Sequence, residues 1–245
     1  EAASGEIFVN TWIHHGFVTI KDEKMSKSLG NFLTIREMLE RYSAETLRLF
    51  IFSAGYRTPL DFSDQAMKDA EAGVDKIYTC LATVTDLPLN GTDGATAIGK
   101  KDRAKLEKLG ERLESAMAND FNSAQALGYI FDGVKTLNKI SGNLPSSPAQ
   151  IDLKLLTDCS QTITNFMNIL GLINQNPKQY VQNKQDKLIA TLSITPQEIT
   201  TLIAERNQAR ADKNWNRADE IRDMLLEHHV EMMDGGEGTT WQVKV

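Results

Sequence analysis

One polar segment near the start of the chain carries the residue types needed to bind a polyphosphate. It reads Lys24-Met25-Ser26-Lys27-Ser28 and continues as Leu29-Gly30-Asn31. A lysine ammonium is a compact, mobile point charge that suits negative charge growing and shifting during phosphoryl chemistry. Serine hydroxyls and loop N–H groups can add hydrogen bonds to phosphate oxygens. Such a loop can close over a polyphosphate, although a solvated surface turn is the commoner use of lysine and serine.

A second group of residues lies near the other end of the sequence. Trp215 and Asp219 follow Arg210 by five and nine positions. Trp215 and Asp219 are four residues apart, so they share one face of a helix. An exposed tryptophan can stack on an unpaired base, while arginine and aspartate can bond base edges. The alternative is that Trp215 packs between two helices and the charges are solvated.

The elements that must position these residues are mostly helices. Residues 17–20 predict a strand, preceded by a short helix or turn over 8–15, and residues 21–32 a loop. A lone strand needs partners, which the chain does not obviously supply. Thr34 and Glu37 form a capping box that predicts a helix start, and Ser43 predicts a second helix ending at Gly55.

The rest of the chain predicts a helical bundle and a small C-terminal domain. Ser63 caps a helix to about residue 84, and three amphipathic helices cover about 100–118, 123–141 and 149–172 after a linker at 86–99. Residues 174–193 lack sustained periodicity and predict a flexible linker. Thr195 starts a helix to about 211, and a second helix over 215–228 leads into a glycine-rich hairpin. The fold class is therefore mainly α, with an antiparallel bundle.

Composition limits the possible classes of protein. The chain has 245 residues, and 27 Lys+Arg against 33 Asp+Glu give a net charge of −6, which by itself argues against nucleic-acid binding. Residues 195–245 are the most acidic segment, with 6 basic and 10 acidic side chains. No apolar run is long enough to span a membrane, and the start lacks a signal-peptide pattern. Cys80 and Cys159 have no metal-ligand spacing, so no metal site is expected and a reducing compartment fits.

The lysine-serine segment resembles the signature loop of class I aminoacyl-tRNA synthetases. Four further stretches are similar to the cysteinyl-tRNA synthetase family, and the resemblance spans essentially the whole chain, weakest at 86–115 and 142–194. They are Val9-Asn10-Thr11-Trp12-Ile13-His14-His15-Gly16, Tyr56-Arg57-Thr58-Pro59-Leu60-Asp61-Phe62-Ser63, Asn119-Asp120-Phe121-Asn122-Ser123 and Asp234-Gly235-Gly236-Glu237-Gly238-Thr239-Thr240-Trp241.

This resemblance implies a division into domains. Residues 1–62 would be the end of a nucleotide-binding α/β catalytic domain, with its strand and signature loop. Residues 63–173 would be a helical bundle of tRNA-binding type, 174–194 a linker and 195–245 an anticodon-binding domain with a helix pair and a hairpin.

The resemblance also implies roles for individual residues. Lys24 and Lys27 would act on the phosphates during amino-acid adenylation, within an ATP-binding segment of Lys24, Met25, Ser26, Lys27 and Ser28. The anticodon-reading set would be Arg210, Trp215, Asp219 and Asp234. The implied partners are ATP with Mg, L-cysteine and cysteine tRNA, in a cytoplasmic enzyme expected to be monomeric.

The sequence departs from the family pattern in one respect. It lacks the H-I-G-H-type motif and the zinc-ligand motif, so the chain resembles the C-terminal half of such an enzyme, with zinc bound by the N-terminal half. The first residue is Glu1, so we expect a chain that is processed or a piece of a longer protein. Without the two motifs, it is expected to be inactive alone. Of His14 and His15, one is expected at a helix end or in packing and the other exposed, and Trp12 is expected as a core residue. Two alternatives stay open: the related cysteine–amino-sugar ligase, and a stand-alone tRNA-binding or scaffold module.

Overall fold

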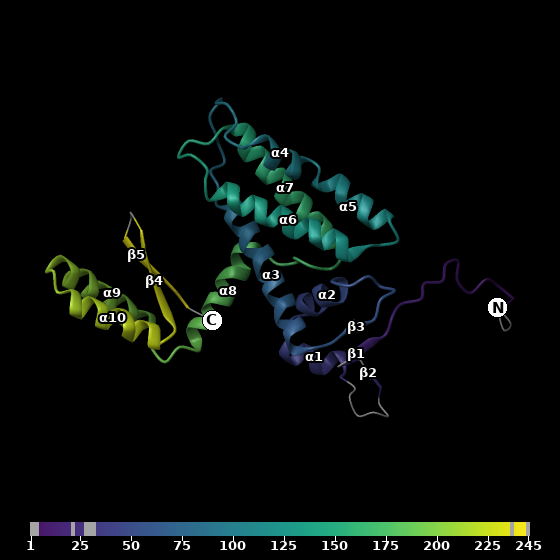
Figure 1. The fold of residues 1–245 in the computed structure, drawn as a ribbon, viewed down its shortest axis with the longest axis horizontal. Helices are drawn as coiled ribbons and strands as arrows, with labels where there is room; N and C mark the ends of the chain where they lie inside the picture. The colour runs from purple at the N-terminus through teal and green to yellow at the C-terminus, as the bar shows by residue number, and fades with distance from the viewer. Residues whose placement is uncertain (1–4, 21–22, 27–32, 236–237, 244–245) are drawn as a thin grey trace. The chain divides into compact units, whose positions relative to one another are not determined.

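The structure is a computed structural model that describes residues 5–20, 23–26, 33–235 and 238–243. The chain divides into two compact units, Glu1–Lys178 and Gln179–Val245, and each is described by itself (Figure 1). The division falls within the 174–194 segment that the sequence indicated as a connection.

A small sheet lies near the start of the first unit. Strand β1 (Val18–Ile20) pairs antiparallel with β2 (Glu23–Lys24) and parallel with β3 (Leu60–Asp61). The strand at β1 is confirmed. The expectation that it lacks partners within the chain is wrong, because β3 comes from about 40 residues further on. The expected loop over 21–32 also contains β2.

Residues 8–15 form neither helix nor strand, contrary to the expectation of a helix or turn there. Trp12 was expected in the core, but 70% of its surface is exposed and its ring tilts against that of Phe8. Ile7, Ile13 and Phe17 are also more than half exposed. This segment therefore presents an apolar surface.

Two short helices follow the sheet, and both begin at the predicted caps. Helix α1 (Ile35–Arg41) starts at Thr34, whose capping box with Glu37 is complete in both directions. Helix α2 (Ala44–Phe52) starts at Ser43, whose hydroxyl accepts from the Thr46 amide at 3.0 Å. It ends at Phe52, three residues before the expected Gly55.

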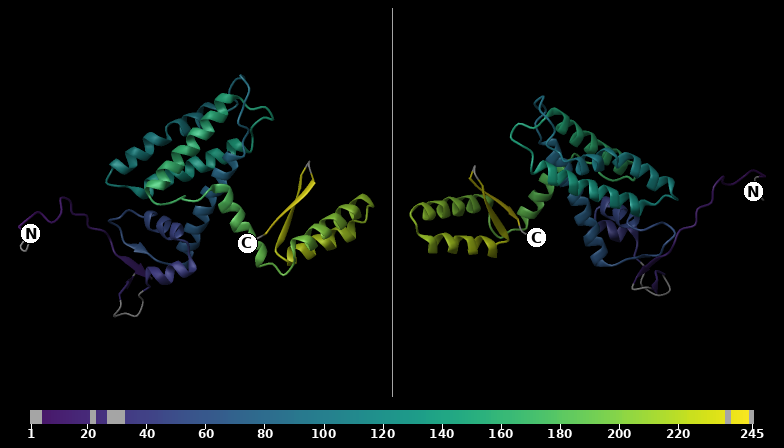
Figure 2. Two further views of the ribbon diagram at one scale, coloured as in Figure 1. Left: turned by 180° about the vertical axis from the view of Figure 1, so that it is seen from behind. Right: turned by 45° about the horizontal axis from the view of Figure 1, so that its top comes forward.

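A bundle of helices α3 to α7 forms the core of the first unit (Figure 2). Their fully buried side chains include Met67, Ile77, Leu81, Ile130, Leu137, Leu156, Ile163 and Met167. The helices are α3 (Asp64–Thr85), α4 (Lys100–Glu107), α5 (Leu109–Ala118), α6 (Ser123–Ser141) and α7 (Gln150–Ile169).

The helix expected over 100–118 is interrupted at Lys108, where φ is −90° and ψ is 2°. Leu106 and Leu109 are both buried on either side of this break. The two short helices thus keep one continuous apolar pattern, which is why periodicity did not reveal the interruption.

The segment after α7 is fixed by a buried carboxylate. Glu45 on α2 accepts hydrogen bonds from the Tyr78 hydroxyl at 2.8 and 3.0 Å and from the Asn174 amide at 2.9 Å. Tyr78 is fully buried, and its pKa is raised above the ordinary value first by desolvation. These bonds join three segments far apart in the sequence.

The second unit is a helix pair with a hairpin. Helix α8 (Pro177–Ala190) begins in the first unit and continues into the second. Helices α9 (Pro196–Ala211) and α10 (Trp215–Glu227) pack together, and β4 (Val230–Gly235) pairs antiparallel with β5 (Gly238–Val243). Their shared core contains Ile194, Ile199, Ile203, Ile221, Leu225 and Val230, with Trp241 half-buried against it.

Helix α8 occupies most of the segment that was predicted to be a flexible linker. None of its described side chains is buried, so it has no apolar face that periodicity could detect. Side-chain bonds four residues apart, Gln179 to Asn183 and Gln182 to Asp186, both 2.8 Å, support it locally instead.

Candidate functional site

The lysine-serine segment begins in the small sheet. The backbone of Lys24 pairs with Thr19 in β1, and the Met25 amide donates to the Val18 carbonyl at 3.1 Å. Met25 and Ser26 are half-buried. Lys27 and Ser28 lie outside the described residues. The structure therefore fixes the first part of the predicted phosphate-binding segment against β1.

Strand β1 is hydrogen-bonded on its other side to the segment that leads into α3. The Leu60 amide donates to the Phe17 carbonyl at 2.9 Å, and the Phe62 amide donates to Thr19 at 2.8 Å. The Thr19 hydroxyl adds a 2.9 Å bond to the Asp61 carboxylate.

After the lysine-serine segment, Thr34 caps the start of α1. Hydrogen bonds from Thr34 lower the pKa of the Glu37 carboxyl that completes this cap.

In the second unit, the structure brings together two of the four predicted base-reading residues. Arg210, on the last turn of α9, donates from a terminal nitrogen to the Asp234 carboxylate on β4 at 2.8 Å. Both side chains are nearly half exposed, at 44% and 45%. They lie at the end of the unit where α9 passes into α10.

Trp215 and Asp219 lie at this end of the unit too. Trp215 is the first residue of α10, after the Asn214 cap, and it is 59% exposed. The alternative in which Trp215 packs between the helices is therefore wrong, because most of its ring faces solvent. Asp219 is exposed one turn further along α10.

Sequence reasoning missed Arg206. It is only 9% exposed, and its two terminal nitrogens bond both oxygens of Asp234 at 3.0 and 2.9 Å. The Thr239 hydroxyl adds a bond to Asp234 at 2.9 Å. The signal available was an arginine three residues after Ile203 on the apolar stripe of α9, because a cation at a core position needs a carboxylate partner.

These donors change the acidity of Asp234. Hydrogen bonds from Arg206, then from Thr239, hold the pKa of its carboxyl well below the ordinary aspartate range. The pKa of Arg206 is raised, first by its bond to Asp234, and the charge of Asp219 contributes in the same direction. The carboxylate therefore stays ionised at any physiological pH.

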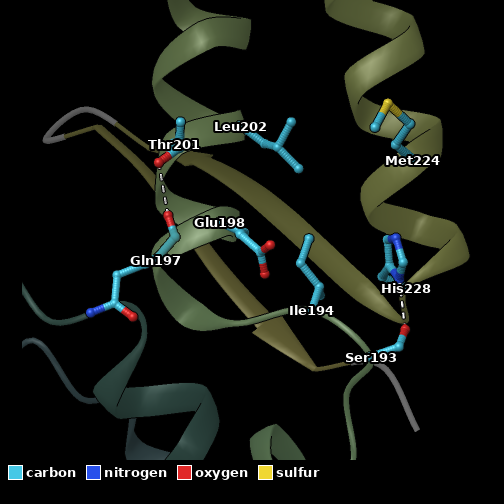
Figure 3. Close-up of a pocket in the computed structure, with 8 residues that line it drawn as sticks. All are labelled: Ser193, Ile194, Gln197, Glu198, Thr201, Leu202, Met224 and His228. Carbon is cyan, nitrogen blue, oxygen red and sulfur yellow. Dashed lines mark hydrogen bonds between the residues drawn. The ribbon is translucent and has the colours of Figure 1, made fainter.

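A separate hollow occupies the opposite end of the helix pair, and Figure 3 shows the residues that line it. It holds about 470 Å³. Its side chains come from the start of α9 and the end of α10, and Ser193 bonds the His228 ring at 2.8 Å. Glu198 and Arg210 are twelve residues apart on α9, which separates the two ends by about 18 Å. The hollow thus takes no part in the Arg210 cluster.

Within the described residues, no group of three or more His, Cys, Asp or Glu side chains could hold a metal ion. His14 and His15 are both exposed, contrary to the expectation that one of them packs, and the His15 ring lies 2.6 Å from the Gly16 carbonyl oxygen. Cys80 and Cys159 are buried free thiols whose pKa values burial raises to about 12. No helix of the described chain is long and apolar enough to cross a membrane.

Comparison with known protein families gives three matches in order along the chain. Residues 1–72 match the model described as "tRNA synthetases class I (C) catalytic domain". Residues 112–174 match the DALR domain, and residues 195–241 match the "Cysteinyl-tRNA ligase anticodon binding domain".

Curated relatives match the whole chain. The cysteine–tRNA ligase of Desulfotalea psychrophila is 46% identical over 243 residues, which is 99% of this chain and 50% of the relative. That of Geobacter metallireducens is 44% identical over 247 residues, covering 100% of this chain and 50% of the relative. The chain spans about half the length of the curated relatives it matches. Because three family models match in order along the chain and the identity extends over its full length, the chain belongs to the cysteine–tRNA ligase family.

Proposed function

We propose that the protein containing this chain attaches cysteine to its tRNA, using ATP and a cysteinyl-adenylate intermediate. The observation that carries the proposal is the order of the three family matches, from catalytic domain through DALR domain to anticodon-binding domain. In this proposal, residues 1–62 complete a catalytic domain, 63–173 form the bundle, 174–194 connect, and 195–245 read the anticodon.

The catalytic contribution of this chain is the segment after β1. During adenylation the cysteine carboxylate would attack the α-phosphate of ATP, and the bond to the leaving pyrophosphate would break; Mg would accompany the ATP. Lys24 and Lys27 are proposed to stabilise the charge that develops on the phosphates, with Met25, Ser26 and Ser28 lining the ATP. Pairing of Lys24 and Met25 with β1 supports this, because it fixes one end of the segment at the sheet.

The remaining substrates would bind elsewhere in the protein. The described residues offer no zinc site, so no step is assigned to zinc here. The exposed apolar side chains of Ile7, Phe8, Trp12, Ile13 and Phe17 support a further proposal: this surface packs against the N-terminal half of the enzyme. Because tRNA charging takes place where translation does, we place the enzyme in the cytoplasm. We also propose that it is a monomer.

The RNA-reading contribution would come from the second unit. Trp215 is proposed to stack on an unpaired anticodon base, and Arg210, Asp219 and Asp234 to bond base edges. The exposure of Trp215 beside an ionised Arg210–Asp234 pair supports this reading. The match at residues 195–241 also argues against the cysteine–amino-sugar ligase, which has no anticodon module.

The test separates the two contributions in the full-length enzyme. We expect Trp215→Ala to lower kcat/KM for aminoacylation roughly 5- to 150-fold, the equivalent of about 1–3 kcal/mol of stacking, with ATP–pyrophosphate exchange unchanged. Met224→Ala, at the opposite end of the helix pair, is the matched control and should change neither. Lys27→Ala should lower turnover in both assays. Equal losses in both assays for Trp215→Ala would contradict an anticodon role.

A further inference from the structure

The Asp234 carboxylate has its hydrogen-bonding capacity filled. One oxygen accepts from Arg206 at 3.0 Å and from Thr239 at 2.9 Å. The other accepts from Arg206 at 2.9 Å and from Arg210 at 2.8 Å. Two carboxylate oxygens offer about four lone-pair sites, so a base edge can bond Asp234 only by displacing one of these donors.

The donors differ in how easily they can leave. Arg206 makes two parallel bonds, and its side chain is only 11% exposed. Arg210 makes a single bond to Asp234, and its side chain is 44% exposed, so water can replace the lost contact. A buried bidentate pair is costly to break, whereas an exposed single contact is worth little. Arg210 is therefore the donor that RNA can displace.

Arg206 also interacts with two carboxylates. Its guanidinium bonds Asp234, and the charge of Asp219 on α10 acts on it as well. Both carboxylates belong to the proposed reading set.

We propose that Arg206 is a positioning residue for RNA reading. Its two hydrogen bonds orient the Asp234 carboxylate. Before RNA binds, Arg210 occupies the hydrogen-bonding position on Asp234 that the base would take. When an unpaired base arrives, Arg210 releases Asp234, whose freed lone pair accepts from an amino or imino group of the base. Arg210 then donates to the RNA. This inference rests on the proposed function of the second unit.

The conservative substitution Arg206→Lys tests the role, because it keeps the charge and removes the two-pronged geometry. In the full-length enzyme we expect KM for cysteine tRNA to rise roughly 5- to 100-fold, with kcat and ATP–pyrophosphate exchange unchanged. We also expect weaker discrimination. The ratio of kcat/KM between cysteine tRNA and tRNAs carrying single anticodon substitutions should fall toward one at the base that Asp234 contacts.

Arg217→Lys is the matched control. Arg217 lies on the same helix pair and bonds Glu205 at 2.8 Å and Glu220 at 3.0 Å, without touching Asp234. It should keep both KM and discrimination. If Arg206→Lys lowers the melting temperature of the enzyme, Thr239→Val removes a different donor from Asp234 and should still reduce discrimination at the same base.

The outcomes separate this inference from the proposed function. If Trp215→Ala impairs aminoacylation but folded Arg206→Lys discriminates among anticodons as the unmodified enzyme does, the positioning role is wrong and the reader stands. If neither substitution affects aminoacylation, the proposed function of the unit is wrong. A uniform loss with every tRNA for both Arg206→Lys and Thr239→Val would also overturn the positioning role.

Discussion

At the scale of single residues, Asp234 shows how a surface carboxylate becomes a fixed part of the structure. Nearly half of its side chain is exposed, yet Arg206, Arg210 and Thr239 all donate to it. Sequence comparison alone could identify Asp234 and Arg210 as candidates through a resemblance. It could not show that they bond each other, because they are 24 positions apart and no local pattern links them.

The lowered pKa of Asp234 predicts an acid-sensitive contribution to stability. A carboxyl with a depressed pKa in the folded state stabilises fully above its unfolded value of about 3.9, and loses this contribution as pH falls toward the folded value. We therefore expect Asp234→Asn to lower the melting temperature of the second unit at pH 7, with a difference that shrinks between pH 4 and pH 2. Calorimetry across that range measures it.

The control for this experiment is Asp212→Asn at the C-cap of α9, whose carboxylate accepts from the Gln208 side chain one turn earlier, at 3.1 Å. It should give a small difference at every pH. A difference for Asp234→Asn that stays constant down to pH 2 would contradict the lowered pKa.

At the scale of elements, predictions based on caps agreed with the structure. Thr34, Ser43, Ser63 and Thr195 all begin helices as expected, because each side chain accepts from an amide of the first turn. Two of the errors arose where the stabilising interaction was distant in the sequence or involved no apolar face. Strand β1 depends on β3 about 40 residues away, and α8 forms without a buried face.

The capping box at Thr195 should contribute measurably to the second unit. Its hydroxyl accepts from the Glu198 amide, and Glu198 accepts from the Thr195 amide at 2.8 Å. We expect Thr195→Ala to lower the free energy of unfolding by about 1 kcal/mol, since loss of the cap leaves the Glu198 amide without this acceptor. Urea unfolding followed by Trp241 fluorescence, with Trp12 and Trp215 replaced by Phe, measures it.

Thr200→Ala is the matched control, because that exposed hydroxyl bonds only the Pro196 carbonyl in the same helix, at 2.8 Å. It should be neutral or slightly stabilising, since alanine is the better helix former. A loss equal to that of Thr195→Ala would mean that the cap makes no special contribution.

At the scale of the whole molecule, the division into two units predicts separate unfolding. Each unit has its own core: Ile163 is fully buried in the first, and Ile221 is fully buried in the second. We expect Ile221→Ala to destabilise the second unit by about 2–5 kcal/mol and to leave the first unit's calorimetric transition in place. Ile163→Ala should have the reverse effect. A single transition that moves with both substitutions would show that the units unfold together.

The bond between Glu45 and Asn174 has a consequence for how the first unit folds. It joins residues 129 positions apart, and Tyr78 completes it from the middle of the bundle. Contacts of such large sequence separation carry a high closure entropy and tend to form after the helices between them have packed. Tyr78→Phe should therefore raise the unfolding rate roughly fivefold or more while leaving the folding rate unchanged.

Stopped-flow mixing with urea measures both rates. Tyr129→Phe is the control, because its hydroxyl bonds only Gln125, four residues away, at 2.9 Å, and should change neither rate appreciably. A slower folding limb in Tyr78→Phe would place the Glu45 cluster in the folding nucleus. With the expected result, the cluster governs how long the first unit stays folded and has no effect on how fast it folds.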